Sequence, residues 1–287
     1  MLPRRSVLYM PGANERALEK AKGLDADALI LDLEDAVAPD AKAEARDRVC
    51  AAAASGDYGA KEVTIRVNGL TTEWHDADIA AAAKAGPAAV VVPKVDSVED
   101  VHAIEASLEA GGAPEHTKIW AMVETPMAML HAEAIAAASE RLTVLVMGTN
   151  DLAKELQASH VPGRQPLLSG LGLCLLAARA TGKIVLDGVY NDIKDPEGFE
   201  AECLQGAQMG FDGKTLIHPT QVEPANRTFA PAADAVDDSR ALIATFEEAV
   251  AAGKGVVTHN GRMIENLHVD NARRILAVAD AIAARQS

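Results

Sequence analysis

The sequence predicts an α/β fold, a (β/α)8 TIM barrel followed by a C-terminal helical extension. Eight short runs of apolar or β-branched residues alternate with longer alanine-rich segments, and eight is the number of strands that this barrel needs. The length of 287 residues suits one barrel with a small addition. A doubly wound open sheet is the rival architecture, but no glycine-rich nucleotide loop follows the first run.

Each predicted strand is short and each is followed by a loop or helical segment. The strands are expected at residues 6–11, 28–35, 62–69, 88–95, 118–125, 142–149, 183–190 and 213–219. Helical periodicity is clear in residues 40–54, 97–110 and 196–209. Two of these helices have start signals, because Ser97 precedes an acidic first turn and Asp195 precedes Pro196.

The end of the chain exceeds what a barrel requires. We expect the barrel to occupy residues 1–228 and a helical extension to occupy residues 229–287. Within the extension we expect one helix at about 236–252 and, after a glycine-punctuated link, an amphipathic helix over 261–276. Glu265 lies beside the apolar face of that last helix. Such an addition is typical of a lid or an interface element.

Composition excludes several classes of partner. With 27 basic and 42 acidic residues the net charge is −15, and no lysine or arginine run exceeds a short pair, so nucleic acids and anionic membranes are not expected to bind. No apolar stretch approaches the 18 residues of a membrane span. The three widely spaced cysteines fit reduced thiols. We therefore expect a cytoplasmic protein.

Polar residues collect at the ends of the predicted strands, where barrel enzymes place their active sites. Glu124 ends the fifth strand and Asp151 follows the sixth. Two carboxylates on adjacent strands suit a hard cation such as Mg2+, with Mn2+ as a substitute, that keeps positions open for water and substrate. Such an ion polarises a carbonyl and stabilises an enolate. Taken singly, each residue also suits a structural ion pair.

Other strand ends carry a possible substrate ligand and further carboxylates. Arg66 offers a planar fork to a carboxylate or a thioester oxygen. Asp32, Glu34 and Asp35 suit the ordering of metal-bound water from a second layer, or equally an ion pair with Arg66 or Lys94. The sequence leaves both alternatives open.

Two further groups of residues are ambiguous. Arg16 and Lys20 are four apart near Tyr9, on one helix face that either meets phosphates or is simply solvated. His218, before Pro219, either faces the substrate or occupies the turn after the last strand. The other seven histidines show no metal-ligand spacing and are expected at the surface or in packing.

Seven motifs resemble the citrate lyase β-subunit-like proteins of the HpcH/HpaI aldolase superfamily, from about residue 4 to the end of the chain. They are RRSVLYMPG, DLEDAV, IRVNG, VPKV, MVETPMAML, GFDGKTLIHP and NGRMIENLHVDNARRIL, and they keep the order of the family. Within the family the chain is most similar to the malyl-CoA group of lyases and thioesterases. The resemblance implies a Mg2+-dependent barrel enzyme that acts on short hydroxyacyl-CoA thioesters, as a homotrimer or a dimer of trimers.

The resemblance also implies roles for individual residues. It assigns the metal to Glu124 and Asp151, the acyl end to Arg66, CoA contacts to Tyr9, Arg16 and Lys20, and a substrate-contact pair to Ile217 and His218.

One position departs from the common pattern of the family. Many relatives have GxMID near the C-terminus, with an aspartate that reaches the active site of a neighbouring subunit as the acid/base, whereas GRMIE places Glu265 there. The extra methylene moves the carboxylate by about a bond length, and a misplacement of about 1 Å costs on the order of 10²-fold in rate. The longer side chain of Glu265 therefore favours the activation of water over carbon–carbon chemistry.

The expected reaction is therefore the hydrolysis of (3S)-malyl-CoA to malate and CoA. Two alternatives stay open. One is carbon–carbon cleavage of malyl-CoA, methylmalyl-CoA or citramalyl-CoA to an acyl-CoA and a 2-oxo acid. The other is a citrate lyase β-type subunit that depends on partner chains.

Overall fold

The computed structural model describes residues 2–253 and 256–286. The chain divides into two compact units, Arg4–Arg227 and the C-terminal unit Thr228–Ser287, which also takes in Met1–Pro3. Within the described ranges, no helix has the length and apolar character that crossing a membrane requires.

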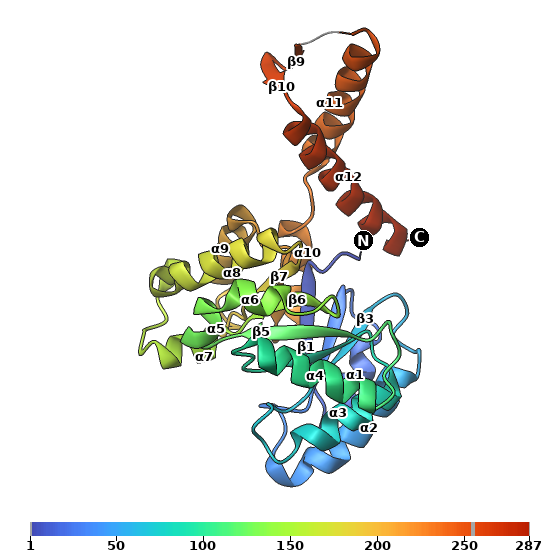
Figure 1. The fold of residues 1–287 in the computed structure, drawn as a ribbon, viewed down its shortest axis with the longest axis vertical. Helices are drawn as coiled ribbons and strands as arrows, with labels where there is room; N and C mark the ends of the chain where they lie inside the picture. The colour runs from blue at the N-terminus through green and yellow to red at the C-terminus, as the bar shows by residue number, and fades with distance from the viewer. Residues whose placement is uncertain (1, 254–255, 287) are drawn as a thin grey trace. The chain divides into compact units, whose positions relative to one another are not determined.

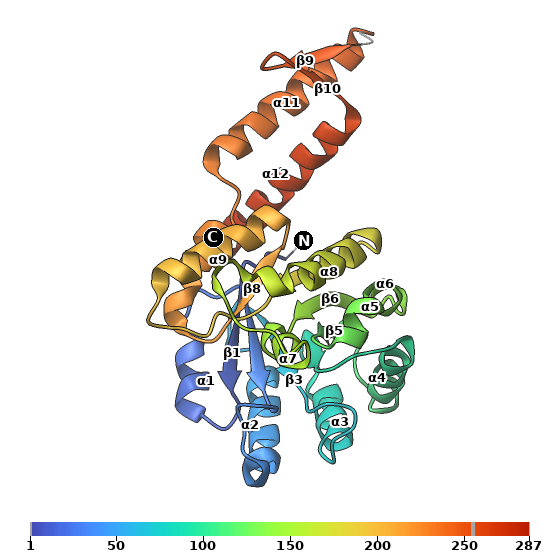
Figure 2. The same cartoon turned by 90° about the vertical axis from the view of Figure 1, so that its left-hand side faces the viewer.

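The first unit is a closed barrel of eight parallel strands in sequential order, as predicted (Figures 1 and 2). Most strands end two or three residues earlier than expected, and the residues after them, Lys94 and Glu124 included, lie in the loops that follow. The strands are β1 (Ser6–Pro11), β2 (Ala28–Asp32), β3 (Glu62–Arg66), β4 (Ala89–Val92), β5 (Lys118–Val123), β6 (Leu142–Met147), β7 (Ile184–Asp187) and β8 (Gly213–Leu216).

The interior of the barrel is filled by alternate residues of its strands, since successive side chains of a strand point to opposite faces. Branched residues and alanine dominate this core, with one large ring from Trp120 and one thioether from Met122. The core is formed by Val7, Ala28, Ile30, Ala89, Val91, Trp120, Met122, Val144, Val146 and Leu186, with Tyr9 and Ile184 packed against it.

Helices surround the strands of the barrel (Figures 1 and 2). Both predicted start signals are confirmed: the Ser97 side chain accepts a hydrogen bond from the Asp100 N–H, and that of Asp195 accepts from the Gly198 N–H. The helices are α1 (Glu15–Ala21), α2 (Lys42–Ala54), α3 (His75–Ala85), α4 (Val98–Ala110), α5 (Pro126–Leu130), α6 (Ala132–Ala137), α7 (Thr149–Glu155), α8 (Leu168–Ala180), α9 (Pro196–Met209) and α10 (Val222–Thr228), with 3-10 turns η1 (Pro39–Ala41), η2 (Pro162–Leu167) and η3 (Pro219–Gln221).

The C-terminal unit contains two packed helices and a hairpin. Helices α11 (Ala233–Ala251) and α12 (Asn266–Gln286) lie side by side, and β9 (Val257–His259) pairs antiparallel with β10 (Arg262–Ile264) (Figures 1 and 2). The expected helix over 261–276 is therefore wrong in its first five residues. Strand pairing overrides the helical periodicity there, because an Asn-Gly turn with positive φ at both residues favours a two-residue hairpin.

Candidate active site

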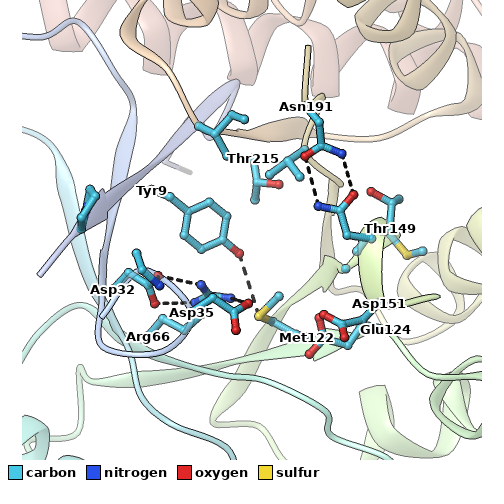
Figure 3. Close-up of a pocket in the computed structure, with 17 residues that line it drawn as sticks. Tyr9, Asp32, Asp35, Arg66, Met122, Glu124, Thr149, Asp151, Asn191 and Thr215 are labelled. Atoms are coloured by element: carbon cyan, nitrogen blue, oxygen red, sulfur yellow. Dashed lines mark hydrogen bonds and ion pairs between the residues drawn. The ribbon is translucent and has the colours of Figure 1, made fainter. Parts of the chain in front are cut away.

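The alternation that fills the barrel also aims charged residues into its mouth. Asp32 ends β2, two residues after Ile30, and Arg66 ends β3. Glu124 comes directly after β5, two residues beyond Met122. They line a cavity of about 370 Å³ at the carboxyl ends of the strands (Figure 3). Other lining residues are Tyr9, Asp35, Gly148, Thr149, Asn150, Asp151, Asn191, Thr215 and Ile217. This is the place where barrel enzymes bind substrates.

Arg66 is buried and held on several sides. Its Nε and Nη2 donate to the two carboxylate oxygens of Asp32 at 2.6 and 2.7 Å (Figure 3). Its Nη1 lies 2.6 Å from Glu34 Oε2. The ring of Tyr9 stacks on the guanidinium at 4.8 Å. Asp35 is exposed and lies 3.7 Å from Nη1. All three carboxylates are therefore ion-pair partners of Arg66, and the ordering of metal-bound water by Glu34 and Asp35 stays a prediction.

The ion pairs of Arg66 leave part of its donor capacity for a ligand. A guanidinium carries five N–H groups, and at hydrogen-bond distance the described residues occupy one at each of the three nitrogens. Asp35, at 3.7 Å from Nη1, lies beyond that distance. One N–H on each terminal nitrogen therefore stays available, and the residue lines the cavity.

Glu124 and Asp151 share the opposite part of the cavity (Figure 3). Glu124 is 2% exposed, and its Oε1 accepts a hydrogen bond from the Lys94 N–H at 2.9 Å. Gly148 makes room for it, because a Cβ at that glycine would lie 2.0 Å from Glu124 Oε2. Asp151 is half-buried in the first turn of α7, and its Oδ1 lies 3.6 Å from Lys94 Nζ.

The carboxylates of this cavity are short of positive charge. Burial, and then the charges of Glu34 and Asp151, raise the pKa of Glu124 to about 8. Burial also raises the pKa of Glu34 to about 7, although Arg66 acts against this. A cation with oxygen preference would relieve both effects.

The donor set fits an open site for a hard cation. Mg2+ is commonly bound by one or two carboxylates together with water and substrate oxygens. Glu124 and Asp151 meet that requirement, whereas residues 2–253 and 256–286 contain no cluster of three or more candidate ligand side chains that would form a closed site.

The structure separates the other predicted residues into two groups. Tyr9 and Ile217 line the cavity. Arg16 and Lys20 are exposed on one face of α1 and do not line the cavity. The His218 Nδ1 accepts from the Thr220 N–H at 3.3 Å in the turn before η3, which favours the turn interpretation of this histidine.

Glu265 lies in the C-terminal unit, whereas every residue that lines the cavity belongs to the barrel unit. It is exposed and immediately precedes α12. Its N–H donates to His268 Nδ1 at 3.0 Å, and its carbonyl accepts from the His268 N–H. Residue 268 thus closes the first turn of the helix and fixes the backbone at Glu265.

Sequence reasoning missed a buried lysine beside the site. Lys42 Nζ donates to the carbonyls of Leu33 and Glu34 and to Asn68 Oδ1, at 2.7 Å each, and so holds the loop that follows β2. The helical spacing of the sequence could have revealed it, because Lys42 lies on the same buried face of α2 as Ala45 and Val49.

Comparison with known proteins gives one family. The family model described as HpcH/HpaI aldolase/citrate lyase matches residues 5–219. A (3S)-malyl-CoA thioesterase of Cereibacter sphaeroides (strain ATCC 17025) is 52% identical over 282 residues, covering 98% of this chain and 96% of the relative. The citrate lyase subunit beta of Escherichia coli K12 is 36% identical over 99% of this chain and 95% of its own.

Solved structures agree with the fold. The protein CitE from Mycobacterium tuberculosis, in complex with magnesium, acetoacetate and coenzyme A, has a TM-score of 0.77 and 28% identity over 97% of this chain and 98% of its own. A citrate lyase from Burkholderia xenovorans LB400 has a TM-score of 0.86, covers 99% of this chain and 93% of its own, and at 19% identity shows the fold alone.

Proposed function

Because the chain belongs to the HpcH/HpaI aldolase/citrate lyase family, we propose that it hydrolyses a short 3-hydroxyacyl-CoA thioester. The proposed substrate is (3S)-malyl-CoA, and the products are malate and CoA. The observation that carries the proposal is the 52% identity with a (3S)-malyl-CoA thioesterase along nearly the whole chain. The chain is also 36% identical to a citrate lyase β subunit, so carbon–carbon cleavage is the second candidate.

Glu124 and Asp151 are the proposed ligands of Mg2+, which Mn2+ could replace. Their support is a pair of oxygen donors in one cavity with a raised pKa at Glu124, together with the magnesium in the structure of the M. tuberculosis relative. When bound, the ion withdraws electron density from the oxygen atoms of the substrate. Glu34 and Asp35 are proposed to order water around the site from a second layer.

Arg66 is proposed to bind the acyl carbonyl oxygen with the two N–H groups that its ion pairs leave available. Asp32 and Tyr9 fix the plane of the guanidinium, so the donors point to one place before the substrate arrives. Donors fixed in advance stabilise a developing oxyanion without a cost of reorganisation.

The CoA part is proposed to contact Tyr9 in the cavity and the exposed side chains of Arg16 and Lys20 on α1. Two cations on one helix face suit the phosphates of CoA. Ile217 offers an apolar contact to the acyl part, and His218, which stands next to it in the turn, is the less direct member of the pair.

Glu265 is proposed as the base that takes a proton from water, in a cytoplasmic homo-oligomer, a trimer or a dimer of trimers, where it serves a neighbouring barrel. The water oxygen then attacks the thioester carbonyl carbon, and the carbon–sulfur bond breaks as the proton passes to the CoA sulfur. The residues 229–287 would in this arrangement form a lid or an interface.

Product analysis tests the proposal. The purified chain with Mg2+ and (3S)-malyl-CoA should release malate and a free thiol in equal amounts, without glyoxylate or acetyl-CoA. Equal amounts of glyoxylate and acetyl-CoA would instead support the lyase. Binding of CoA without any turnover would support a subunit that needs partner chains, and light scattering would give the oligomeric state.

A further inference from the structure

Lys94 contacts both proposed metal ligands, one through its backbone and one through its side chain. The residue follows β4 and has a φ of 52°, in the left-handed region that side chains other than glycine rarely adopt. In this conformation its N–H donates to Glu124 Oε1 at 2.9 Å. The strained backbone thus orients the more deeply buried of the two carboxylates.

The side chain of Lys94 returns to the same carboxylates. Its Nζ lies 3.6 Å from Asp151 Oδ1, and the charges of Glu124 and Glu34 also act on it. The Lys94 side chain is 49% exposed, so its ammonium can leave Asp151 for water at little cost.

We infer that the Lys94 ammonium is a built-in counter-ion of the carboxylate cluster, which a divalent cation displaces when it binds. This inference rests on the proposed metal site. A cation held by Glu124 and Asp151 and an ammonium beside Asp151 repel each other, so both cannot occupy the same carboxylate oxygens. The exchange keeps one positive charge beside Asp151 with and without metal.

The backbone and the side chain of Lys94 have opposite effects on metal affinity. The Lys94 N–H fixes Glu124 in place and favours binding, whereas the Lys94 ammonium competes for Asp151 and opposes binding. Removing only the ammonium should therefore tighten binding. For a half-exposed charge near 4 Å we expect about a three- to tenfold lower dissociation constant.

Titration of the full chain with Mn2+, followed by the electron paramagnetic resonance signal of the free ion, measures this directly. Lys94→Met removes the charge and keeps the apolar stem, while Lys94→Gly removes the charge and suits the positive φ. Both should bind Mn2+ about three- to tenfold more tightly than the parent, and Lys94→Arg should stay close to it. Lys154→Met, an exposed lysine on the same helix as Asp151, is the matched control for net charge.

The outcomes separate this inference from the metal site itself. Equal or weaker Mn2+ binding in both Lys94→Met and Lys94→Gly, with circular dichroism like that of the parent, would overturn the exchange. The same tightening in Lys154→Met would overturn it too, because net charge would then explain the effect. Unchanged binding in Asp151→Asn would instead refute the metal site.

Discussion

Arg66 and Asp32 form a two-point ion pair across neighbouring strands, with Nε–Oδ1 and Nη2–Oδ2 distances of 2.6 and 2.7 Å. The two residues are register partners on β2 and β3, so the pair lies across one rung of the barrel. Two parallel hydrogen bonds remove the freedom of the guanidinium to rotate. The pair therefore sets the direction of the donors that stay available to a substrate.

Asp32→Ala should destabilise the protein and weaken substrate binding together. It leaves the buried Arg66 without its main partner, and breaking a buried pair costs about 3 to 5 kcal/mol. The free energy of unfolding in urea should fall by an amount of this order, and KM for the acyl-CoA should rise. Asp35→Ala is the control, because Asp35 is exposed and 3.7 Å away, and should change stability by less than about 1 kcal/mol. Equal effects of the two substitutions would contradict this account.

Gly148→Ala should weaken metal binding although it replaces no proposed ligand. Its new Cβ would lie 2.0 Å from Glu124 Oε2 and 2.3 Å from Glu124 Cβ, so the carboxylate must leave its place. Overpacking of this kind costs about 1 to 3 kcal/mol in stability. In a Mn2+ titration the dissociation constant should be at least tenfold higher than that of the parent.

The control for Gly148→Ala is a glycine with open space around it. Gly172 lies within α8 and a Cβ there would meet nothing within 4 Å, so Gly172→Ala should leave Mn2+ binding unchanged and stabilise the helix by up to about 1 kcal/mol. If Gly148→Ala bound Mn2+ like the parent, Glu124 would have no part in the metal site.

The barrel and the ends of its strands could be predicted from the sequence because both follow from local patterns. Alternation of side chains in β2, β3 and β5 places Asp32, Arg66 and Glu124 in one mouth once the barrel is closed. The pairing of Arg66 with Asp32 could not be chosen, since the sequence offered several carboxylates at similar distances along the chain. It depends on strand register, which is a tertiary property.

Other features of the site depend on contacts between segments that are distant in sequence. The closeness of Gly148 to Glu124 and the left-handed turn at Lys94 have no local signal, because the contact partner in each case lies on another strand or loop. In the C-terminal unit a local pattern predicted too much helix. The helical periodicity holds from Asn266 onward, but the residues before Asn266 form the hairpin of β9 and β10.

The metal-free protein should lose stability as pH rises from about 5 to 8. The raised pKa of Glu124, about 8, means that the folded state keeps a proton that the unfolded state releases near the ordinary pKa of 4.5. The folded state therefore binds more protons in this window, and the free energy of unfolding falls with rising pH. The raised pKa of Glu34, about 7, acts in the same direction. At about 1.4 kcal/mol per pH unit, Glu124 alone gives a loss on the order of 4 kcal/mol over this window, or roughly 10 °C in Tm.

Thermal melts in a chelating buffer at several pH values measure this slope. Glu124→Gln removes the titrating group and should flatten the dependence, and Glu133→Gln, an exposed glutamate on α6, should leave it as in the parent. A Tm that is constant or rising over this window in the parent would show that Glu124 is ionised in the metal-free fold.

Glu265→Gln should lower kcat by about 10²- to 10⁴-fold and leave KM nearly unchanged, because an amide keeps the shape of the side chain but takes no proton from water. Asp270→Asn, at an exposed position of α12, is the matched control and should keep full activity.

If Glu265 serves a neighbouring barrel, mixing Glu265→Gln chains with Glu124→Gln chains should restore activity. Each mixed oligomer would then contain a barrel with intact metal ligands beside a chain with an intact Glu265. Recovery after subunit exchange, followed by release of free thiol, would establish action between chains. Full activity of Glu265→Gln alone would show that Glu265 has no catalytic role.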